Sequence, residues 1–409
     1  MHSEQRRRDV LACLGGLVAH STARAANEID YSVKLQSIRS GFVQDFRDRK
    51  FCWVHARAGV IPGRPPKVVV TMQKVNTDTG PGSYDVYHSV ADLGSDDLGK
   101  TWSGVVERAE LGPREEGDGI RTTICDFVPQ WHAKTRRLLG TGHTPRYRGN
   151  QILVGDQPIH SAYSVYDAAK RSWCPWRAID FPQDGKFFQV AAGCAQRVDL
   201  ADGTILLPVY FRAKGEPNYQ ATVARCSFDG ETMRYLGHGD ELAVTDKRGL
   251  AEPSLAFYQR RYYLTLRNDV RGYVTSGADG QHFDSIRPWR FDDGTELGNY
   301  NTQQHWVVHS EGLFLTYTRR GANNDHVMRH RAPLFLARVD TEKLCVIRST
   351  ERIVIPERGA DLGNFGVTNV TPDETWITNA EWMRTIRTSD NNVFIARLVW
   401  NRPNRLIPR

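Results

Sequence analysis

A turn unit that recurs along the chain limits the fold more than any other feature of the sequence. Its clearest copy is Ser95-Asp96-Asp97-Leu98-Gly99-Lys100-Thr101-Trp102. In such a unit the aspartate accepts hydrogen bonds from turn N–H groups, the glycine permits a tight backbone, and the closing aromatic residue packs between neighbouring units. Weaker copies follow at Tyr166-Asp167 with Trp173, Ser227-Phe228-Asp229-Gly230, Ser276 with Asp279-Gly280 and Phe283, and Val339-Asp340. Successive copies lie about 50–70 residues apart, which suits a four-stranded unit with its loops.

Between the turns, the chain alternates short β-branched or aromatic runs with Gly, Asp and Asn, as in Lys67–Thr71, Thr204–Leu207 and Tyr262–Leu266. Helical periodicity is nearly absent, so the pattern predicts an all-β fold. We expect a six- or seven-bladed β-propeller with four-stranded antiparallel blades, forming one domain over residues 27–409. Six units are counted directly, the sixth through Val393–Leu398. A seventh would lie in residues 103–160 or be completed by pairing of the two termini.

The composition narrows the class of partner. The net charge is +7 and the pI is about 9.0, but the basic residues are scattered and form none of the clusters expected of a nucleic-acid patch. Guanidinium groups bind carboxylates in a bidentate way, which favours an acidic oligo- or polysaccharide as partner over nucleic acid. No apolar run is long enough for a membrane span.

The first 26 residues are expected to be a signal peptide of twin-arginine type. Arg6-Arg7-Arg8 precedes a modest apolar run from Val10 to Val18, and Ala23-Arg24-Ala25 offers a small-residue cleavage site. A frayed tail of a cytosolic protein is the alternative. We therefore expect a periplasmic or secreted protein.

Cysteine spacing gives no sign of a zinc or redox motif. Export would remove Cys13 and leave Cys52, Cys125, Cys174, Cys194, Cys226 and Cys345, none of them in a CxxC pair. We expect them to pack as small buried residues. No cofactor is expected to be required; a structural calcium is possible, but no residue pattern assigns a metal site.

The chain resembles the sialidase superfamily. The resemblance rests on the Asp-containing turns, on Arg57-Ala58-Gly59-Val60-Ile61-Pro62, which is a loose R-I-P motif, and on Ala251-Glu252-Pro253-Ser254 followed by Arg267. In that family three arginines bind the substrate carboxylate, a Tyr paired with a Glu is the nucleophile, and an Asp is the acid. The resemblance implies that Arg57 and Arg267 are two of the arginines, that Glu252 is the partner of the tyrosine, and that the third arginine is Arg319, Arg320 or Arg331. No Asp of the acid loop follows the R-I-P motif.

A second resemblance is to propeller lyases that act on uronate linkages, the ulvan lyases and L-rhamnose-α-1,4-D-glucuronate lyases. These enzymes use a His, a Tyr far downstream and an Arg some fifteen residues later. The resemblance implies His143, Tyr210 and Arg225 as catalytic residues, with His160 as a further histidine. Elimination needs a neutralised carboxylate, which Arg225 or Arg267 would supply, and a Tyr or His that takes the α-proton.

Other polar residues are candidates for substrate binding. His55 and Arg57 alternate on one strand and are expected to project on one face toward the central pocket. Leu297–Trp306 concentrates amides, an imidazole and aromatics, and Gln304 and His305 within it suit recognition of sugar hydroxyls. Arg320 lies in a donor-rich stretch. Surface or core positions are the alternative interpretation for each residue.

The sequence predicts a secreted enzyme that cleaves a glycosidic bond at a uronic acid by β-elimination. A glycoside hydrolase on the same scaffold, either an exo-α-sialidase or an α-L-rhamnosidase, is the alternative. A non-catalytic glycan-binding propeller is a further alternative. A fold of this type hosts many functions, so the site has to decide among them.

We predict that export of the precursor is accompanied by cleavage near Ala25, because Ala23-Arg24-Ala25 follows the arginine and apolar segments. Mass spectrometry of protein recovered from the periplasm or medium should show a chain that begins close to Ala26. Recovery of intact Met1 there would contradict the prediction.

Overall fold

The computed structural model describes residues 29–38, 51–76, 85–155, 157–382 and 391–407. The expected signal peptide over residues 1–26, with Cys13, lies outside these residues. Within the described ranges the chain is all-β, and its helical pieces are the single 3-10 turns η1 (Ala109–Leu111), η2 (Met328–His330) and η3 (Arg348–Thr350). None of these helices is long and apolar enough to cross a bilayer.

Six antiparallel sheets follow one another along the chain. The first contains β2 (Phe51–Ile61), β3 (Lys67–Asn76), β4 (Tyr87–Ser95) and β5 (Val106–Glu107). The second contains β8 (Cys125–His132), β9 (Arg137–His143), β12 (Ser161–Asp167), β13 (Ser172–Trp173) and β14 (Arg177–Ala178). The third contains β15 (Gln189–Ala191), β16 (Val198–Asp199), β17 (Ile205–Arg212), β18 (Gln220–Phe228) and β19 (Met233–His238).

The remaining three complete the series. The fourth contains β20 (Ala251–Tyr258), β21 (Arg261–Arg267), β22 (Tyr273–Gly277) and β23 (Arg287–Pro288). The fifth contains β24 (His305–His309), β25 (Gly312–Tyr317), β26 (Leu334–Asp340), β27 (Cys345–Val346) and β28 (Arg352–Ile355). The sixth contains β29 (Gly366–Thr371), β30 (Glu374–Ala380), β31 (Val393–Trp400) and β1 (Tyr31–Ile38), so strands from both ends of the chain share one sheet. In its outer ladder Tyr31 pairs with Trp400 and Ile38 with Val393.

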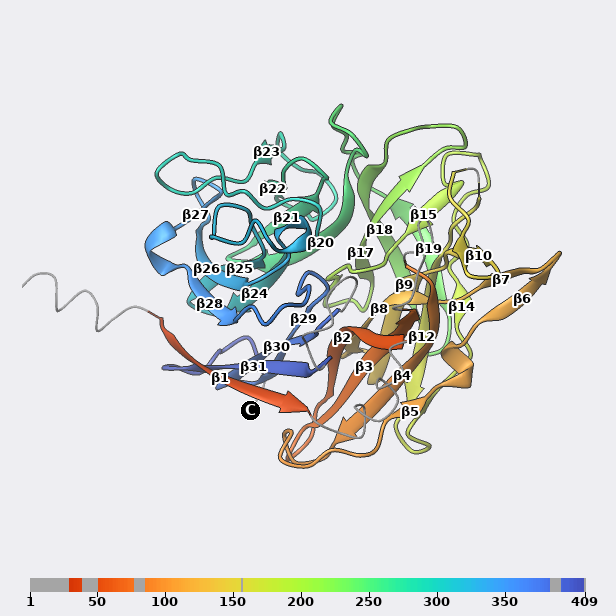
Figure 1. The fold of residues 1–409 in the computed structure, drawn as a ribbon, viewed down its shortest axis with the longest axis horizontal. Coiled ribbons are helices and arrows are strands. Elements are labelled where there is room, and N and C mark those ends of the chain that lie inside the picture. The colour runs from red at the N-terminus through yellow and green to blue at the C-terminus, as the bar shows by residue number, and fades with distance from the viewer. Residues whose placement is uncertain (1–28, 39–50, 77–84, 156, 383–390, 408–409) are drawn as a thin grey trace, which may run out of the picture.

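The six sheets are arranged in a ring. Strand β2 contacts β8 on one side and β29 on the other. Continuing round the ring, β9 contacts β15, and β17 of the same sheet as β15 contacts β20. Strand β24 contacts both β20 and β29, which closes the ring. Figure 1 shows β2, β8, β17, β20, β24 and β29 grouped around the middle of the molecule. Side chains at the starts of these strands can therefore meet at the centre although they are far apart in the sequence.

The hydrophobic core is divided among the interfaces between neighbouring sheets. Six buried clusters each draw residues from at least two neighbouring sheets, and one of them joins the first sheet to the sixth. Trp376, Trp173 and Trp306 are almost completely buried in three of them. Apolar burial at about 25 cal/mol per Å² thus holds the ring together at every interface.

A further small sheet interrupts the series. It contains β6 (Arg114–Gly117), β7 (Ile120–Thr122), β10 (Arg146–Arg148) and β11 (Gln151–Ile152). It lies in residues 103–160, where the sequence left room for a seventh unit, but its strands are short and flank the β8–β9 hairpin on both sides in sequence. Strands from the two ends of the chain do pair, but they complete the sixth sheet rather than a seventh.

The recurring turns have the structure that the sequence predicts. Asp97 accepts hydrogen bonds from the Thr101 N–H (2.9 Å) and from the hydroxyls of Ser95 (2.8 Å) and Thr101 (2.6 Å). In the weaker copies Asp167, Asp229, Asp279 and Asp340 likewise accept from two turn N–H groups each. Trp102 packs against Trp376 of the sixth sheet, with ring centroids 6.2 Å apart. The role assigned to the aspartate and to the closing aromatic is confirmed.

We predict that Asp97→Ala lowers the midpoint of thermal unfolding by a few degrees at neutral pH without abolishing function, because the turn loses three hydrogen bonds. Hydrogen bonds from Thr101 lower the pKa of Asp97 to about 2. The stabilisation is therefore complete above the unfolded-state pKa near 4 and is lost as the pH falls through about 2. Calorimetry of both proteins from pH 7 to pH 2 should show the difference shrinking, whereas Glu342→Ala in a comparable exposed turn should change nothing.

Candidate functional site

A repeated backbone irregularity points side chains at the centre of the ring. Strands β2, β8 and β20 each carry a bulge near their start, and in each the residue with a left-handed φ lies inside it: His55 (56°), Asp126 (52°) and Glu252 (41°). Such φ values are uncommon for residues other than glycine, and a bulge redirects the side chain. Three polar residues from three sheets are thus placed in equivalent positions.

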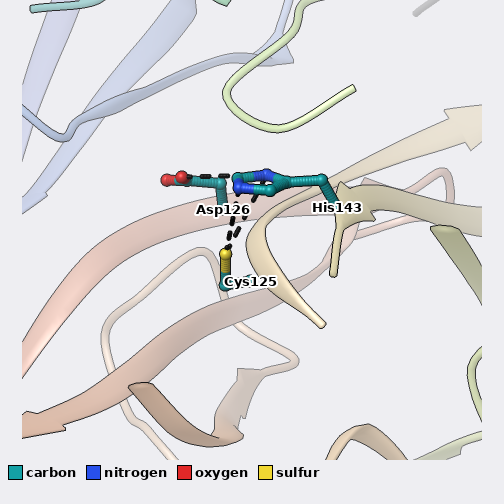
Figure 2. A group of neighbouring side chains, drawn as sticks. All are labelled: Cys125, Asp126 and His143. Carbon is teal, nitrogen blue, oxygen red and sulfur yellow. Dashed lines mark hydrogen bonds and ion pairs between the residues drawn. The ribbon is translucent and has the colours of Figure 1, made fainter. Parts of the chain in front are cut away.

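Asp126 is the meeting point of the first three sheets. Its Oδ1 lies 3.2 Å from Nδ1 of His55 and 3.3 Å from Nη2 of Arg57, and it accepts a hydrogen bond from the thiol of Cys194 at 2.9 Å. Its Oδ2 faces Nδ1 of His143 at 4.0 Å (Figure 2). Burial raises the pKa of Asp126, but the charges of His55, Arg57 and His143 outweigh burial and hold the pKa well below the usual range. The carboxylate therefore stays ionised at neutral pH.

The guanidinium of Arg57 is occupied by the protein itself. Besides Asp126 and Cys194, it donates to Oε1 of Gln303 at 3.0 Å and lies 3.5 Å from the carbonyls of Phe127 and Phe365. Only 1% of its surface is exposed. His55 and Arg57 thus converge as expected, across a bulge rather than by simple alternation. Arg57 was expected to bind a substrate carboxylate. Its guanidinium instead bonds to residues that belong to, or lie within a few residues of, strands of other sheets.

His143 ends β9 and is stacked between neighbours. The Cys125 thiol lies 3.4 Å from its Nε2, as Figure 2 shows, and Gly193 lies against its Nδ1. Burial lowers the pKa of His143 against the opposing charge of Asp126, so the imidazole is neutral at neutral pH and can accept a proton.

The same three residues are a candidate metal group. One ligand atom from each of Cys125, Asp126 and His143 lies within 4.8 Å of the others among the residues that the structure describes. Thiolate, imidazole and carboxylate are the donors that zinc takes. The Arg57 guanidinium on Asp126 is a positive charge at the same place and opposes a cation there.

Tyr210 of β17 is the neighbour of His143 in the third sheet. The two rings meet edge to face with centroids 6.3 Å apart, and Tyr219 packs on the other side of Tyr210 at 5.1 Å. Burial raises the pKa of Tyr210 well above its usual value, and the negative charge of Glu252 adds to the rise. Tyr210 is therefore protonated in the resting protein, with Glu252 as the carboxylate that acts on it.

Glu252 and Arg267 form a buried ion pair in the fourth sheet. Oε2 of Glu252 is buried and has no hydrogen-bond partner among the described residues. Nη2 of Arg267 donates to Oδ1 of Asn301 at 2.8 Å, and Nη2 of Arg331 donates to the backbone carbonyl of Asn301 at 2.6 Å. Of the three arginines proposed for the third position, Arg331 is thus the one that reaches this group. Arg319 instead forms an ion pair with Glu351.

Arg225 does not join this group. It pairs across the strands with Leu206, whereas Tyr210 pairs with Ala221, so the two residues lie at opposite ends of the β17–β18 ladder. Its guanidinium binds Asp202 at 3.0 Å and is 42% exposed. The fifteen-residue spacing that suggested the pair thus places Arg225 at the far end of the same ladder, where it does not contact the buried group around Tyr210 and Glu252.

The other expected residues are dispersed. His160 lies among the charges of Arg146, Glu116 and Asp180, and none of its hydrogen bonds reaches His143. Gln304 and His305 are buried and form hydrogen bonds inside the protein. Oε1 of Gln304 accepts from the Thr265 hydroxyl at 3.0 Å, and Nδ1 of His305 lies 2.8 Å from the Ser254 hydroxyl. Arg320 is exposed at the rim, where its guanidinium lies 4.3 Å from the centre of the Tyr300 ring.

Sequence reasoning missed Asp126, Cys125 and Cys194. A signal for Asp126 was available, because the first strands of different units align around one polar position. In each of three five-residue segments the third residue is polar: His55 in residues 53–57, Asp126 in residues 124–128 and Glu252 in residues 250–254. Asp126 of the second sheet thus brings a carboxylate next to Arg57.

Comparison with known proteins places the fold. No family model matches the chain, and no curated protein sequence matches it. Among solved structures, a protein of unknown function from Dyadobacter fermentans matches with a TM-score of 0.60 at 12% identity, over 91% of this chain and 99% of that one. The Hadza microbial sialidase Hz136 matches with a TM-score of 0.60 at 12% identity, over 88% of this chain and 68% of that one.

A sialidase from Trypanosoma rangeli matches with a TM-score of 0.55 at 15% identity, over 83% of this chain and 54% of that one. The chain thus spans about half the length of that sialidase. These likenesses show a sialidase-like fold. At 12–15% sequence identity, structural similarity is evidence for the fold and not for the activity.

We predict that Gly193→Ala disturbs the site directly. A Cβ at this position would lie 2.0 Å from Nδ1 of His143 and 2.8 Å from Cβ of Asp126, so His143 has to move. The titration of His143, followed by NMR of histidine ring protons, should change, and any activity should fall by about 10-fold or more. Gly104→Ala, where a Cβ meets nothing within 4 Å, is the matched control and should alter neither.

Proposed function

We propose that this protein is an exported, glycan-active enzyme that cleaves a glycosidic bond at an acidic sugar by hydrolysis. We also propose that its six sheets are the blades of a six-bladed propeller, with the β6, β7, β10 and β11 sheet as an insertion. The observation that carries the function is the buried Glu252–Arg267 ion pair beside Tyr210, which shares a buried cluster with Ala251, the residue before Glu252.

The chemistry follows from the charges at the centre. Tyr210 is a weak nucleophile while protonated, and Glu252 is the carboxylate whose charge reaches it. In the proposed reaction the oxygen of Tyr210 attacks the anomeric carbon while its proton passes to Glu252, the glycosidic bond breaks, and the leaving oxygen takes a proton from a general acid of the site. Water then cleaves the bond to the tyrosine and gives a proton back to that acid, while Glu252 returns its proton to the Tyr210 oxygen.

The acidic group of the substrate would be held by Arg267 and Arg331. Both guanidinium groups donate to Asn301, Arg267 to its side chain and Arg331 to its backbone carbonyl, and guanidinium groups suit a carboxylate. Arg57 takes no direct part in this scheme, because its donors are used by Asp126, Cys194 and Gln303. The solved sialidases with this fold, one of them in complex with sialic acid, are consistent with an acidic sugar as substrate.

Elimination at a uronic acid is the second candidate, and one observation favours it. His143 is neutral and lies edge to face with protonated Tyr210, which is the pair that an elimination uses to take the α-proton and return one to the leaving oxygen. The carboxylate would then be neutralised by Arg267 in place of Arg225.

A screen of the purified protein separates the candidates. Rhamnose-capped arabinogalactan, ulvan and sialyl-lactose should be offered, with released sugars identified by mass spectrometry. Hydrolysis adds water across the cleaved bond, whereas elimination leaves an unsaturated uronate with new ultraviolet absorbance. A protein that binds one of these glycans and cleaves none is a lectin-like propeller.

We predict that Glu252→Gln and Tyr210→Phe each lower kcat by about 100-fold or more, because hydrolysis needs both the proton acceptor and the nucleophile. Tyr210→Phe preserves the ring and its packing, so its thermal midpoint should change little. Glu252→Gln leaves the buried charge of Arg267 with Asp269 as its carboxylate partner, so its midpoint should fall. Steady-state kinetics on the substrate found in the screen gives the result.

Matched controls exist for both variants. Glu351→Gln removes the charge from another glutamate paired with arginine, Arg319, and Tyr263→Phe alters another buried tyrosine. Neither should change kcat. Loss of activity in Tyr210→Phe with wild-type turnover in Glu252→Gln would point to elimination, and the reverse pattern would remove Tyr210 from the mechanism.

A further inference from the structure

A hydrogen-bonded chain of three side chains lies at the rim of the candidate site. The phenolic oxygen of Tyr300 is 2.6 Å from Nδ1 of His330, and Nε2 of His330 is 3.1 Å from Oδ1 of Asp325. A hydroxyl, an imidazole and a carboxylate in this order form the arrangement by which a base activates a nucleophile and a third group orients the base.

The chain is attached to the central group. Tyr300 directly precedes Asn301, whose side chain and backbone carbonyl hold Arg267 and Arg331. Arg267, which donates to Asn301, also forms the ion pair with Glu252. Tyr300 is half-buried and 22% of the His330 side chain is exposed, so both can be reached from solvent.

Backbone and charge at this place are unusual. Asn301, Arg329 and His330 all have left-handed φ values, of 53°, 53° and 52°. Residues in such conformations cost free energy and gather at active sites, where the surrounding structure holds them. Arg320 stacks on the Tyr300 ring, and burial raises the pKa of Tyr300 while the charges of Arg320, Arg329 and Arg331 act against the rise. A phenolate formed here would be surrounded by cations.

A second chain of the same composition serves as an internal comparison. Tyr235 lies 2.5 Å from Nδ1 of His238, and Nε2 of His238 lies 3.0 Å from Glu241. It belongs to β19, the outer strand of the third sheet, and Glu241 is also bound by Lys186. A tyrosine, a histidine and a carboxylate in hydrogen-bond contact therefore do not by themselves identify a site. Two features distinguish the Tyr300 chain: Asn301 next to it binds Arg267 and Arg331, and Asn301 and His330 have left-handed φ values.

We propose that Tyr300 is a proton-transfer residue of the glycan site, with His330 as its base and Asp325 orienting the imidazole. In the forward step the O–H bond of Tyr300 breaks as Nδ1 of His330 takes the proton, and the phenolate accepts a proton from the substrate or from the attacking water. The imidazolium, paired with Asp325, returns its proton to the leaving oxygen. No oxidant or metal enters the balance.

Activation of Tyr300 can be tested without a substrate. An arylsulfonyl fluoride reacts with an activated phenol: the oxygen–sulfur bond forms, fluoride leaves, and the phenolic proton goes to His330. We expect benzenesulfonyl fluoride to modify Tyr300 before the other tyrosines, including Tyr235, as mapped by peptide mass spectrometry. His330→Gln, which keeps a hydrogen-bond acceptor but not a base, should slow the modification by about 10-fold or more, and Asp325→Asn by a smaller factor.

The outcomes are separable. Equal modification of Tyr300 and Tyr235, or an unchanged rate in both His330→Gln and Asp325→Asn, overturns the proposal. Asp325 is 92% exposed, so its variant tests the relay even if His330→Gln fails to fold.

The role of Tyr300 in catalysis rests on the proposed function, and steady-state kinetics tests it separately. On the substrate found in the screen, Tyr300→Phe should lower kcat by about 100-fold with KM within about twofold, and Tyr235→Phe should change neither. Unchanged kcat in Tyr300→Phe overturns that role. Selective modification of Tyr300 in a protein that cleaves no glycan supports its activation and refutes the proposed function instead.

Discussion

The buried ion pair between Arg57 and Asp126 is the interaction on which the centre of the ring depends. Arg57 comes from β2 and Asp126 from β8, and the same guanidinium reaches Cys194, Gln303 and the Phe365 carbonyl from three further sheets. Two charges withdrawn from water lose several kcal/mol each in solvation, and an uncompensated charge costs about 3–5 kcal/mol when its partner is removed. The centre is therefore stable only when all these sheets are in register around one arginine.

This requirement explains why the arginines have different tasks. A guanidinium with its donors used inside the protein cannot also bind a substrate carboxylate in a bidentate way. Arg57 is in that position, because its donors face Asp126, Cys194 and Gln303. The Nη groups of Arg267 are likewise taken, by Glu252, Asn301 and Asp269. A substrate carboxylate bound by Arg267 would therefore displace one of these partners, next to Glu252. The sequence motif at Arg57 marks the fold more than the substrate.

The fold was predictable because its signals are local. A turn such as Ser95–Trp102 contains all the groups that stabilise it, so its residues identify it without knowledge of the rest of the chain. The candidate site was only partly predictable, because its members meet through bulges and register. His143 and Tyr210 are neighbours in space, but Arg225, only fifteen residues after Tyr210, is carried to the other end of its ladder by the pairing of Leu206 with Arg225. Spacing along a chain does not give the strand register, and one extra residue at a bulge reverses which face a side chain takes.

Backbone conformation is the feature that unites the central residues with the rim. His55, Asp126, Glu252, Asn301 and His330 differ in chemistry, yet each has a left-handed φ that a residue with a Cβ adopts at a cost. Other left-handed residues, such as Leu98, Arg136 and Gln259, lie in turns between strands. At Glu252 the ion pair with Arg267 helps to hold the conformation. The Tyr235 chain lies on an outer strand, and neither Tyr235 nor His238 has a positive φ. Because a hydroxyl, an imidazole and a carboxylate are linked there without a left-handed residue among Tyr235 and His238, the strain at Asn301 and His330 does not follow from the hydrogen bonds themselves.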